Sequence, residues 1–398
     1  MGFRTTLAVA ALVTIAIELP ALAQKNYGPG VSDTEVKIGS TGPVSNAASS
    51  ASAEMRSFAA YFAEINAEEG GVNGRKINVV AADDGGEPTR AIEQTRKLVE
   101  QDGVLFMANS LGTPAQLAVR QYLNDRKVPQ LFPASGAAPF YDARNSPWTV
   151  GFAPSNDREG RLIGKYVGES MPGAKIGVLY QNDDVGKDFL RGAKESSGAS
   201  IVAQQSYDVG DAKIDAQIAS LQASGADVLF AFATEQTAAL AIRRAAAIGW
   251  KPKIFIPSSV PSAAVLEAAG LDNARGVVKA AYLKDPASPG WENDPDAKEF
   301  AAWMKKYDSS VNIHDTVAAM HGYVVARLIE KILKAAGNDL SRENILKQAN
   351  DLHHVVLPLL LPGITVDTSP TDHRAIDQLR FEYFDGENWV LTGNTVSE

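Results

Sequence analysis

Cysteine is absent from this 398-residue chain. Its absence excludes disulfide bonds, thiol nucleophiles, thiolate metal sites and a lipid-anchored N-terminal cysteine. An apolar core must therefore hold the fold, and a hydrophobic content of 45% can supply one.

Common catalytic motifs are missing too. The chain has no G-x-S-x-G, H-E-x-x-H, P-loop or G-x-G-x-x-G pattern. Its five histidines lie at positions 314, 321, 353, 354 and 373. His314 and His321 share a predicted helix but have no carboxylates in a ligand pattern, so core or surface positions are favoured over a metal site. We therefore expect no enzyme activity, no metal site and no cofactor.

Positive charge is in deficit, with 38 Lys and Arg against 47 Asp and Glu and a net charge of −9. This balance argues against nucleic acid or an anionic membrane surface as a partner. No stretch approaches the roughly 20 consecutive apolar residues of a membrane-spanning helix, so no membrane insertion is expected.

The N-terminal residues 1–23 read as a secretory signal. Arg4 gives a weak positive start, residues 7–17 are apolar, and Ala21-Leu22-Ala23 is a small-x-small cleavage pattern. The mature chain is expected to begin near Gln24 and to reside in the periplasm, and without cysteine it is not a lipoprotein.

Strand and helix patterns alternate from end to end, which predicts an α/β fold with parallel, doubly wound sheets covered by helices on both faces. The mature length predicts two domains. In the first half the pattern predicts strands at 35–39, 76–81, 103–108 and 128–132 and helices at 51–66, 88–101 and 114–126. It restarts at the strand 174–180, and further strand-like runs lie at 355–366 and 378–391.

The turn at 109–114 joins an apolar strand to a helix. Thr113 suits an N-cap and Pro114 the first helical position. Gly112 permits close backbone approach, and a helix N-terminus with the hydroxyls of Ser110 and Thr113 can hold an anion. A small carboxylate is the ligand predicted here, although an ordinary capped helix also fits the pattern.

Several motifs resemble the solute-binding receptors of branched-chain amino acid ABC transporters. The motifs are IGSTGP (38–43), INAEEGGVNG (65–74), VLYQNDDVGK (178–187), ASLQASGADVL (219–229), AAAIGWKP (245–252) and AYLKDP (281–286). The similarity covers essentially the whole mature chain, and the motifs in this order are specific.

The resemblance implies a type I periplasmic-binding fold, in which two lobes close on a solute and the closed form docks on a membrane permease. Three hinge crossings are expected near 150–154, 281–285 and 357–365. The N-terminal lobe would comprise residues 24–151 and 285–357, and the C-terminal lobe 152–284 and 358–398. A monomer is expected.

The resemblance also implies the site. The turn aligned with Ser110, Leu111 and Thr113 would hold the ligand carboxylate, with the turn Ala134, Ser135 and Gly136. In the second lobe, Val185 and Ser258 occupy ligand-facing positions, and Tyr282 is a candidate wall.

Two classes of ligand fit the predicted site: an aromatic carboxylate and an amino acid. Amino acid receptors of this family offer an acidic residue to the ammonium group where this chain has Ser258 and Ser259. An aromatic carboxylate, such as a benzoate or hydroxycinnamate, is therefore favoured, unless Glu235 or Asp184 reaches an ammonium group. A branched-chain or other aliphatic amino acid is the alternative, and a periplasmic sensor for a signalling receptor is a second one.

Overall fold

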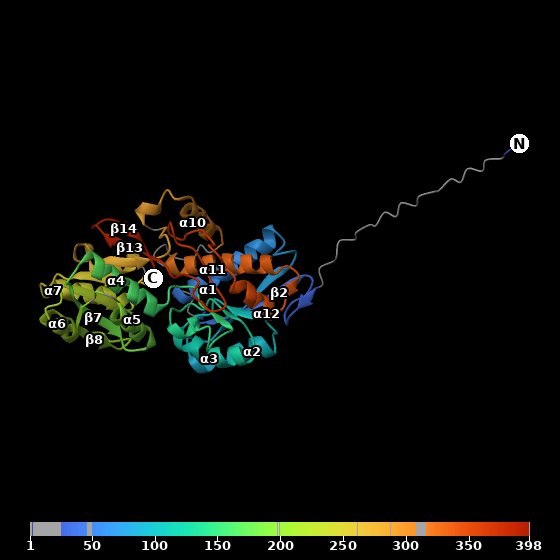
Figure 1. The fold of residues 1–398 in the computed structure, drawn as a ribbon, viewed down its shortest axis with the longest axis horizontal. Helices are drawn as coiled ribbons and strands as arrows, with labels where there is room; N and C mark the ends of the chain where they lie inside the picture. Colours follow the sequence, from blue (N-terminus) through green and yellow to red (C-terminus); the bar gives the residue numbers. More distant parts are fainter. Residues whose placement is uncertain are drawn as a thin grey trace.

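The computed structural model describes Gly2 and residues 25–45, 50–196, 198, 200–260, 262–286, 288–307 and 316–397. The predicted signal sequence, apart from Gly2, lies outside the described residues, as does His314. The described chain forms two α/β lobes, as predicted (Figure 1). None of its described helices has the length and apolar character needed to cross a membrane.

The N-terminal lobe contains a parallel sheet with strand order β3-β2-β4-β5-β6. Its strands are β2 (Glu35–Gly42), β3 (Lys76–Asp83), β4 (Phe106–Ala108), β5 (Gln130–Leu131) and β6 (Thr149–Val150). The order reverses at β2, and such a reversal opens a crevice at the carboxyl ends of the strands, where ligands of α/β proteins bind.

The C-terminal lobe repeats this order in a larger sheet, β14-β13-β11-β10-β9-β7-β8. Its strands are β7 (Lys175–Gln181), β8 (Ser200–Tyr207), β9 (Val228–Phe232), β10 (Lys253–Ile256), β11 (Val278–Ala281), β13 (Leu379–Phe384) and β14 (Trp389–Val396). The sheet is mixed rather than wholly parallel, because β13 and β14 add to its edge as an antiparallel pair. A chain that returns from the other lobe can pair in this direction without a crossover helix.

Helices cover both sheets (Figure 1). The N-terminal lobe has α1 (Ser50–Glu68), α2 (Pro88–Glu100), α3 (Thr113–Asp125), α10 (Pro295–Tyr307), α11 (Thr316–Ala336) and α12 (Arg342–Ala349). The C-terminal lobe has α4 (Asn156–Ser170), α5 (Asp184–Glu195), α6 (Asp215–Ala223), α7 (Glu235–Ala247), α8 (Ser262–Ala269) and α9 (Leu271–Ala274). The short elements are β1 (Asn26–Tyr27), β12 (Asp339–Leu340), η1 (Ala138–Tyr141) and η2 (Pro289–Trp291).

The sequence pattern did not predict helix α4. It carries several glycines, which lower helix propensity by about 1 kcal/mol each relative to alanine. The structure shows why glycine is tolerated: a Cβ on Gly160 would lie 2.2 Å from the carbonyl oxygen of Phe189 in α5. Close packing of α4 on α5 stabilises the helix and compensates for its low helix propensity.

The last crossing between the lobes differs from the expected one. The amide of Lys284 donates to Leu359 O over 2.7 Å, so two crossing segments lie side by side. Ala375 then donates to Gly151 O, and His373 Nδ1 lies 2.7 Å from Thr149 O, at the end of β6. These bonds hold residues 373–375 against the N-terminal lobe, beyond the expected boundary at 357/358.

The strand-like run at 355–366 forms no regular strand. It contains an isolated antiparallel bridge between Val355 and Val366. Apolar residues in this run instead fill the core beside the crossing: Leu357, Leu359, Leu360, Leu361 and Ile364 are all buried. Burial of the crossing, rather than sheet pairing, explains its apolar composition.

Candidate functional site

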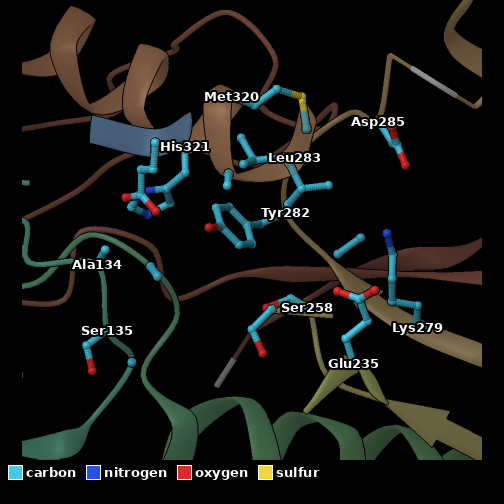
Figure 2. A pocket seen from close by; sticks show the side chains of 17 residues that line it. Ala134, Ser135, Glu235, Ser258, Lys279, Tyr282, Leu283, Asp285, Met320 and His321 are labelled. Carbon is cyan, nitrogen blue, oxygen red and sulfur yellow. The ribbon is translucent and has the colours of Figure 1, made fainter. Parts of the chain in front are cut away.

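A cavity of about 360 Å³ lies between the lobes at the carboxyl ends of both sheets (Figure 2). Its wall comes from residues that follow strands β5, β9, β10 and β11, together with helices α1 and α11. The lining residues are Glu54, Ala134, Ser135, Gly136, Ala153, Glu235, Ser258, Ser259, Lys279, Ala281, Tyr282, Leu283, Asp285, Val317, Ala318, Met320 and His321. The cavity therefore occupies the place that the strand order predicts for a ligand.

Five of the predicted site residues line this cavity. They are Ala134, Ser135, Gly136, Ser258 and Tyr282. The other four are outside its lining: Ser110, Leu111, Thr113 and Val185. All nine assignments to a ligand remain predictions.

The turn at 109–114 packs inward. Ser110 is 1% exposed, and its hydroxyl accepts the amide of Thr41 over 3.1 Å. Helix α3 begins at Thr113 with Gly112 as its N-cap at φ 91°, so Thr113 is not the cap and Pro114 is the second helical residue. Since Thr113 Oγ1 lies 2.7 Å from Ser135 Oγ, this turn supports the cavity wall from behind.

We expect Ser110→Ala to destabilise the N-terminal lobe. The change leaves the buried Thr41 amide without its acceptor, which costs about 1–3 kcal/mol. Urea unfolding of residues 24–398 would measure the loss. The exposed Ser170→Ala is the control, and equal stability of the two variants would contradict the structural role.

The turn at 133–136 makes its own bonds. The amide of Ala134 donates to Ser110 O over 2.9 Å, and the Tyr141 hydroxyl donates to Ser135 O over 3.0 Å. A Cβ on Gly136 would lie 2.2 Å from Asn156 Oδ1, so this position needs glycine. The turn is therefore a rigid wall of the cavity.

Val185 lies in the first turn of α5, half-buried against the main core. The loop before it is shaped by Asp183, whose carboxylate accepts the Gly186 amide over 3.1 Å and caps the helix. Val185 packs against the core and is not part of the cavity lining.

Acidic side chains are prominent in the lining, which sequence reasoning largely missed. Glu54 from α1 and Asp285 from the second crossing join Glu235 from the first residue of α7 (Figure 2). Glu54 Oε1 lies 2.7 Å from His321 Nδ1 on α11, and both side chains are about nine-tenths buried. Among the described residues, no group of three or more His, Cys, Asp or Glu is placed to hold a metal ion.

Lys279 is the basic residue of the C-terminal wall. It lies on β11, and its Nζ is 3.6 Å from Glu382 Oε2 and 5.4 Å from the ring centroid of Trp389. The Lys279 and Glu382 side chains are 5% and 2% exposed. Glu382 compensates the charge of Lys279, so the two form a buried ion pair beside the cavity.

A buried carboxyl group lies directly behind Ser258. Glu159 in the first turn of α4 is 1% exposed, and its two oxygens accept the Ser258 amide over 2.6 Å and the Ser258 hydroxyl over 2.7 Å. Burial raises the pKa of Glu159 to about 7, although both hydrogen bonds act to lower it. No sequence signal pointed to this role of Glu159, because helix α4 was not predicted.

Apolar groups close the N-terminal side. Tyr282 stands among Leu283, Met320 and His321 in the wall (Figure 2). Phe152 packs behind Tyr282 with ring centroids 6.5 Å apart, and it is fully buried. Phe152 is therefore a core residue, whereas Tyr282 lines the cavity.

Comparison with known proteins agrees with this architecture. Residues 35–387 match the family described as periplasmic binding protein. The Leu/Ile/Val-binding protein homolog 1 of Brucella suis biovar 1 is 25% identical over 283 residues, covering 70% of this chain and 72% of that protein. For curated relatives the matched part spans from 53% to 72% of their own lengths.

Solved structures share the fold. A branched-chain amino acid ABC transporter protein from Thermus thermophilus with bound valine has a TM-score of 0.80 at 17% identity, covering 92% of this chain and 98% of that chain. A solute binding protein of an ABC transporter from Rhodopseudomonas palustris BisB5, in complex with 3,4-dihydroxybenzoic acid, has a TM-score of 0.73 at 21% identity over the same shares. These likenesses show the type I periplasmic-binding fold, and the resemblance to Leu/Ile/Val-binding receptors is confirmed. The chain belongs to the periplasmic binding protein family.

Proposed function

We propose that this chain is the substrate-binding receptor of an ABC uptake system, and that it captures a small organic acid between its lobes. The supporting observation is the cavity, because its wall comes from both lobes. A ligand that contacts both lobes stabilises the closed arrangement more than the open one. The closed receptor would deliver its ligand to a membrane permease from the periplasm.

The ligand that best fits the cavity is an amino acid with an apolar side chain. The preference for an aromatic acid rested on Ser258 standing where an acidic residue was expected. Glu235 lines the same cavity, and in the view of Figure 2 its carboxylate lies between Ser258 and Lys279, so an ammonium group has a carboxylate within the site. Because an unpaired buried ammonium is costly, this carboxylate reverses the preference.

The two ends of the cavity suit the two ends of such a ligand. Leu283, Met320 and Val317 give an apolar surface for the side chain. The turn at 134–136 offers polar groups to a carboxylate, and Lys279 lies on the opposite side of the cavity in Figure 2. The relative from Brucella suis, named a Leu/Ile/Val-binding protein homolog, agrees with this class of ligand.

A hydroxylated aromatic acid is the second candidate. Ser258, Ser259 and Tyr282 present hydroxyl groups together with an aromatic ring, and these suit a phenolic ring. The structural neighbour from Rhodopseudomonas palustris BisB5 holds 3,4-dihydroxybenzoic acid, but at 21% identity it shares the fold alone.

Calorimetry on the mature chain, unfolded and refolded to remove resident ligand, tests the proposal with L-leucine and 4-hydroxybenzoate. We expect L-leucine to bind, and Glu235→Gln to weaken it by about 10- to 100-fold, because the charge-assisted bond to the ammonium is lost. The same variant should change any 4-hydroxybenzoate affinity by less than about threefold.

The exposed Glu267→Gln on α8 is the matched control, and it should leave both affinities unchanged. Unchanged L-leucine affinity in Glu235→Gln would contradict the role of Glu235. Binding of 4-hydroxybenzoate without L-leucine would restore the aromatic acid as the ligand.

A further inference from the structure

Ser258 connects the cavity to a buried acid on another element. It follows β10 and lines the cavity, while Glu159 lies behind it in the first turn of α4. The two residues are 99 positions apart in the chain. Glu159 itself is not part of the cavity lining.

The geometry of the pair is bidentate. Ser258 N donates to Glu159 Oε1 over 2.6 Å, and Ser258 Oγ donates to Glu159 Oε2 over 2.7 Å. Bonds to an ionised acceptor of this length are the strong kind. The serine hydrogen is thereby directed toward α4, which leaves the hydroxyl lone pairs for a group in the cavity.

We propose that Glu159 is a positioning residue whose protonation state decides whether Ser258 offers the ligand a hydrogen-bond acceptor or a donor. The inference rests on the proposed function. With Glu159 ionised, Ser258 accepts from an ammonium or phenol. When one proton from solvent binds Oε2, that oxygen donates to Ser258 Oγ, and the serine hydrogen turns to the cavity, where it suits a carboxylate or carbonyl.

The groups around Glu159 allow both states near neutral pH. Lys279 on β11 favours the ionised form, whereas burial disfavours it more strongly, and the pKa of Glu159 is about 7. Two buried tyrosines also lie near Glu159: Tyr282, which follows β11, and Tyr141 in η1. Burial is the main cause of the raised pKa of each hydroxyl, and the negative charge of Glu159 raises it further.

Helix α5 packs against α4 without directing charge at Glu159. Its Arg191 lies 2.6 Å from Asp188 and 3.8 Å from Asp157. These three charged groups pair with one another, and the polar groups that act on the pKa of Glu159 are Ser258 and Lys279.

The first experiment needs no ligand. Infrared spectroscopy follows the carbonyl stretch of protonated carboxyl groups in the mature chain as pH rises. We expect a band that disappears with a midpoint near pH 7, that is missing in Glu159→Gln, and whose midpoint rises in Ser258→Ala because a donor to the carboxylate is removed. A missing band, or a midpoint unchanged by Ser258→Ala, would overturn the inference.

The second experiment measures L-leucine affinity between about pH 5.5 and 8.5, with the same titration of the Glu159→Gln variant cancelling any change in the charge of the ligand itself. The wild-type affinity should rise by about three- to tenfold across this range, because the ionised pair accepts from the ammonium. Glu159→Gln, whose amide donates to Ser258 permanently, should bind with a flat profile. The same rise in that variant would overturn the inference and assign the pH dependence to another group.

Failure of the proposed function has a different signature. If neither L-leucine nor 4-hydroxybenzoate binds at any pH, the ligand proposal fails. The infrared comparison of wild type with Ser258→Ala still decides whether Glu159 and Ser258 are coupled.

Discussion

Replacing Gly322 with alanine is expected to lower the free energy of unfolding by about 3 kcal/mol, near the upper end of the cost of overpacking a tight contact. Gly322 lies on α11, where a Cβ would come within 2.2 Å of Glu54 O and 3.1 Å of Phe58 N in α1. Both contacts are backbone atoms of a packed helix, so the two helices must separate. Alanine improves helix propensity by about 1 kcal/mol, which is too little to compensate.

The same substitution should also weaken ligand binding. Gly322 is next to His321, and separation of α1 from α11 disturbs the 2.7 Å contact between His321 and Glu54 in the cavity wall. Urea unfolding and calorimetry with L-leucine measure the two effects. Gly290→Ala is the control, because its nearest neighbour lies 3.8 Å from the new Cβ. Full stability of Gly322→Ala would show that the helices have room to adjust.

Glu159→Gln should change how stability depends on pH. A carboxyl group whose pKa is raised from 4.5 to about 7 on folding binds its proton more tightly in the folded state. Its contribution to stability is therefore present in full below pH 4.5 and is lost as pH rises through about 7. The loss is about 3 kcal/mol in wild type, and it should be absent in the variant, which keeps an acceptor and a donor for Ser258.

Urea unfolding at several pH values from about 4 to 8.5 measures this difference, taken as wild type minus variant so that other titrating groups cancel. Glu169→Gln, an exposed position on the same helix, should follow the wild-type curve. A constant difference between wild type and Glu159→Gln across this range would mean that Glu159 titrates alike in the folded and unfolded chain.

Local sequence patterns predicted most helices and strands well. The predicted helix 51–66 corresponds to α1 (Ser50–Glu68), and the predicted strand 76–81 to β3 (Lys76–Asp83). Such elements have regular apolar spacing and end at turn residues, which are properties of neighbours in the chain. Helix α4 and the run at 355–366 were misjudged because close packing on α5 and burial in the crossing decide them.

The candidate site also contains parts that could be predicted from the sequence and parts that could not. The family resemblance indicated the turn at 134–136 and Ser258, and the structure places both directly after strands whose carboxyl ends meet at the cavity. It did not indicate that the turn at 109–114 packs inward, because a capped helix and an anion cradle share one local pattern. The contact of Ser110 with Thr41, in strand β2 of the same lobe, decides between the two.

By itself, the sequence determined the α/β class, the two similar lobes and the family. These follow from apolar periodicity, turn residues and family motifs, which can be recognised without knowing the contacts between distant segments. Only the tertiary structure decided that Glu54 meets His321 across 267 residues and that Glu159 lies behind Ser258 across 99. These distances follow from how α1 packs on α11 and α4 on the second sheet. Charge and polarity in the cavity are therefore set by packing between segments that no local pattern relates.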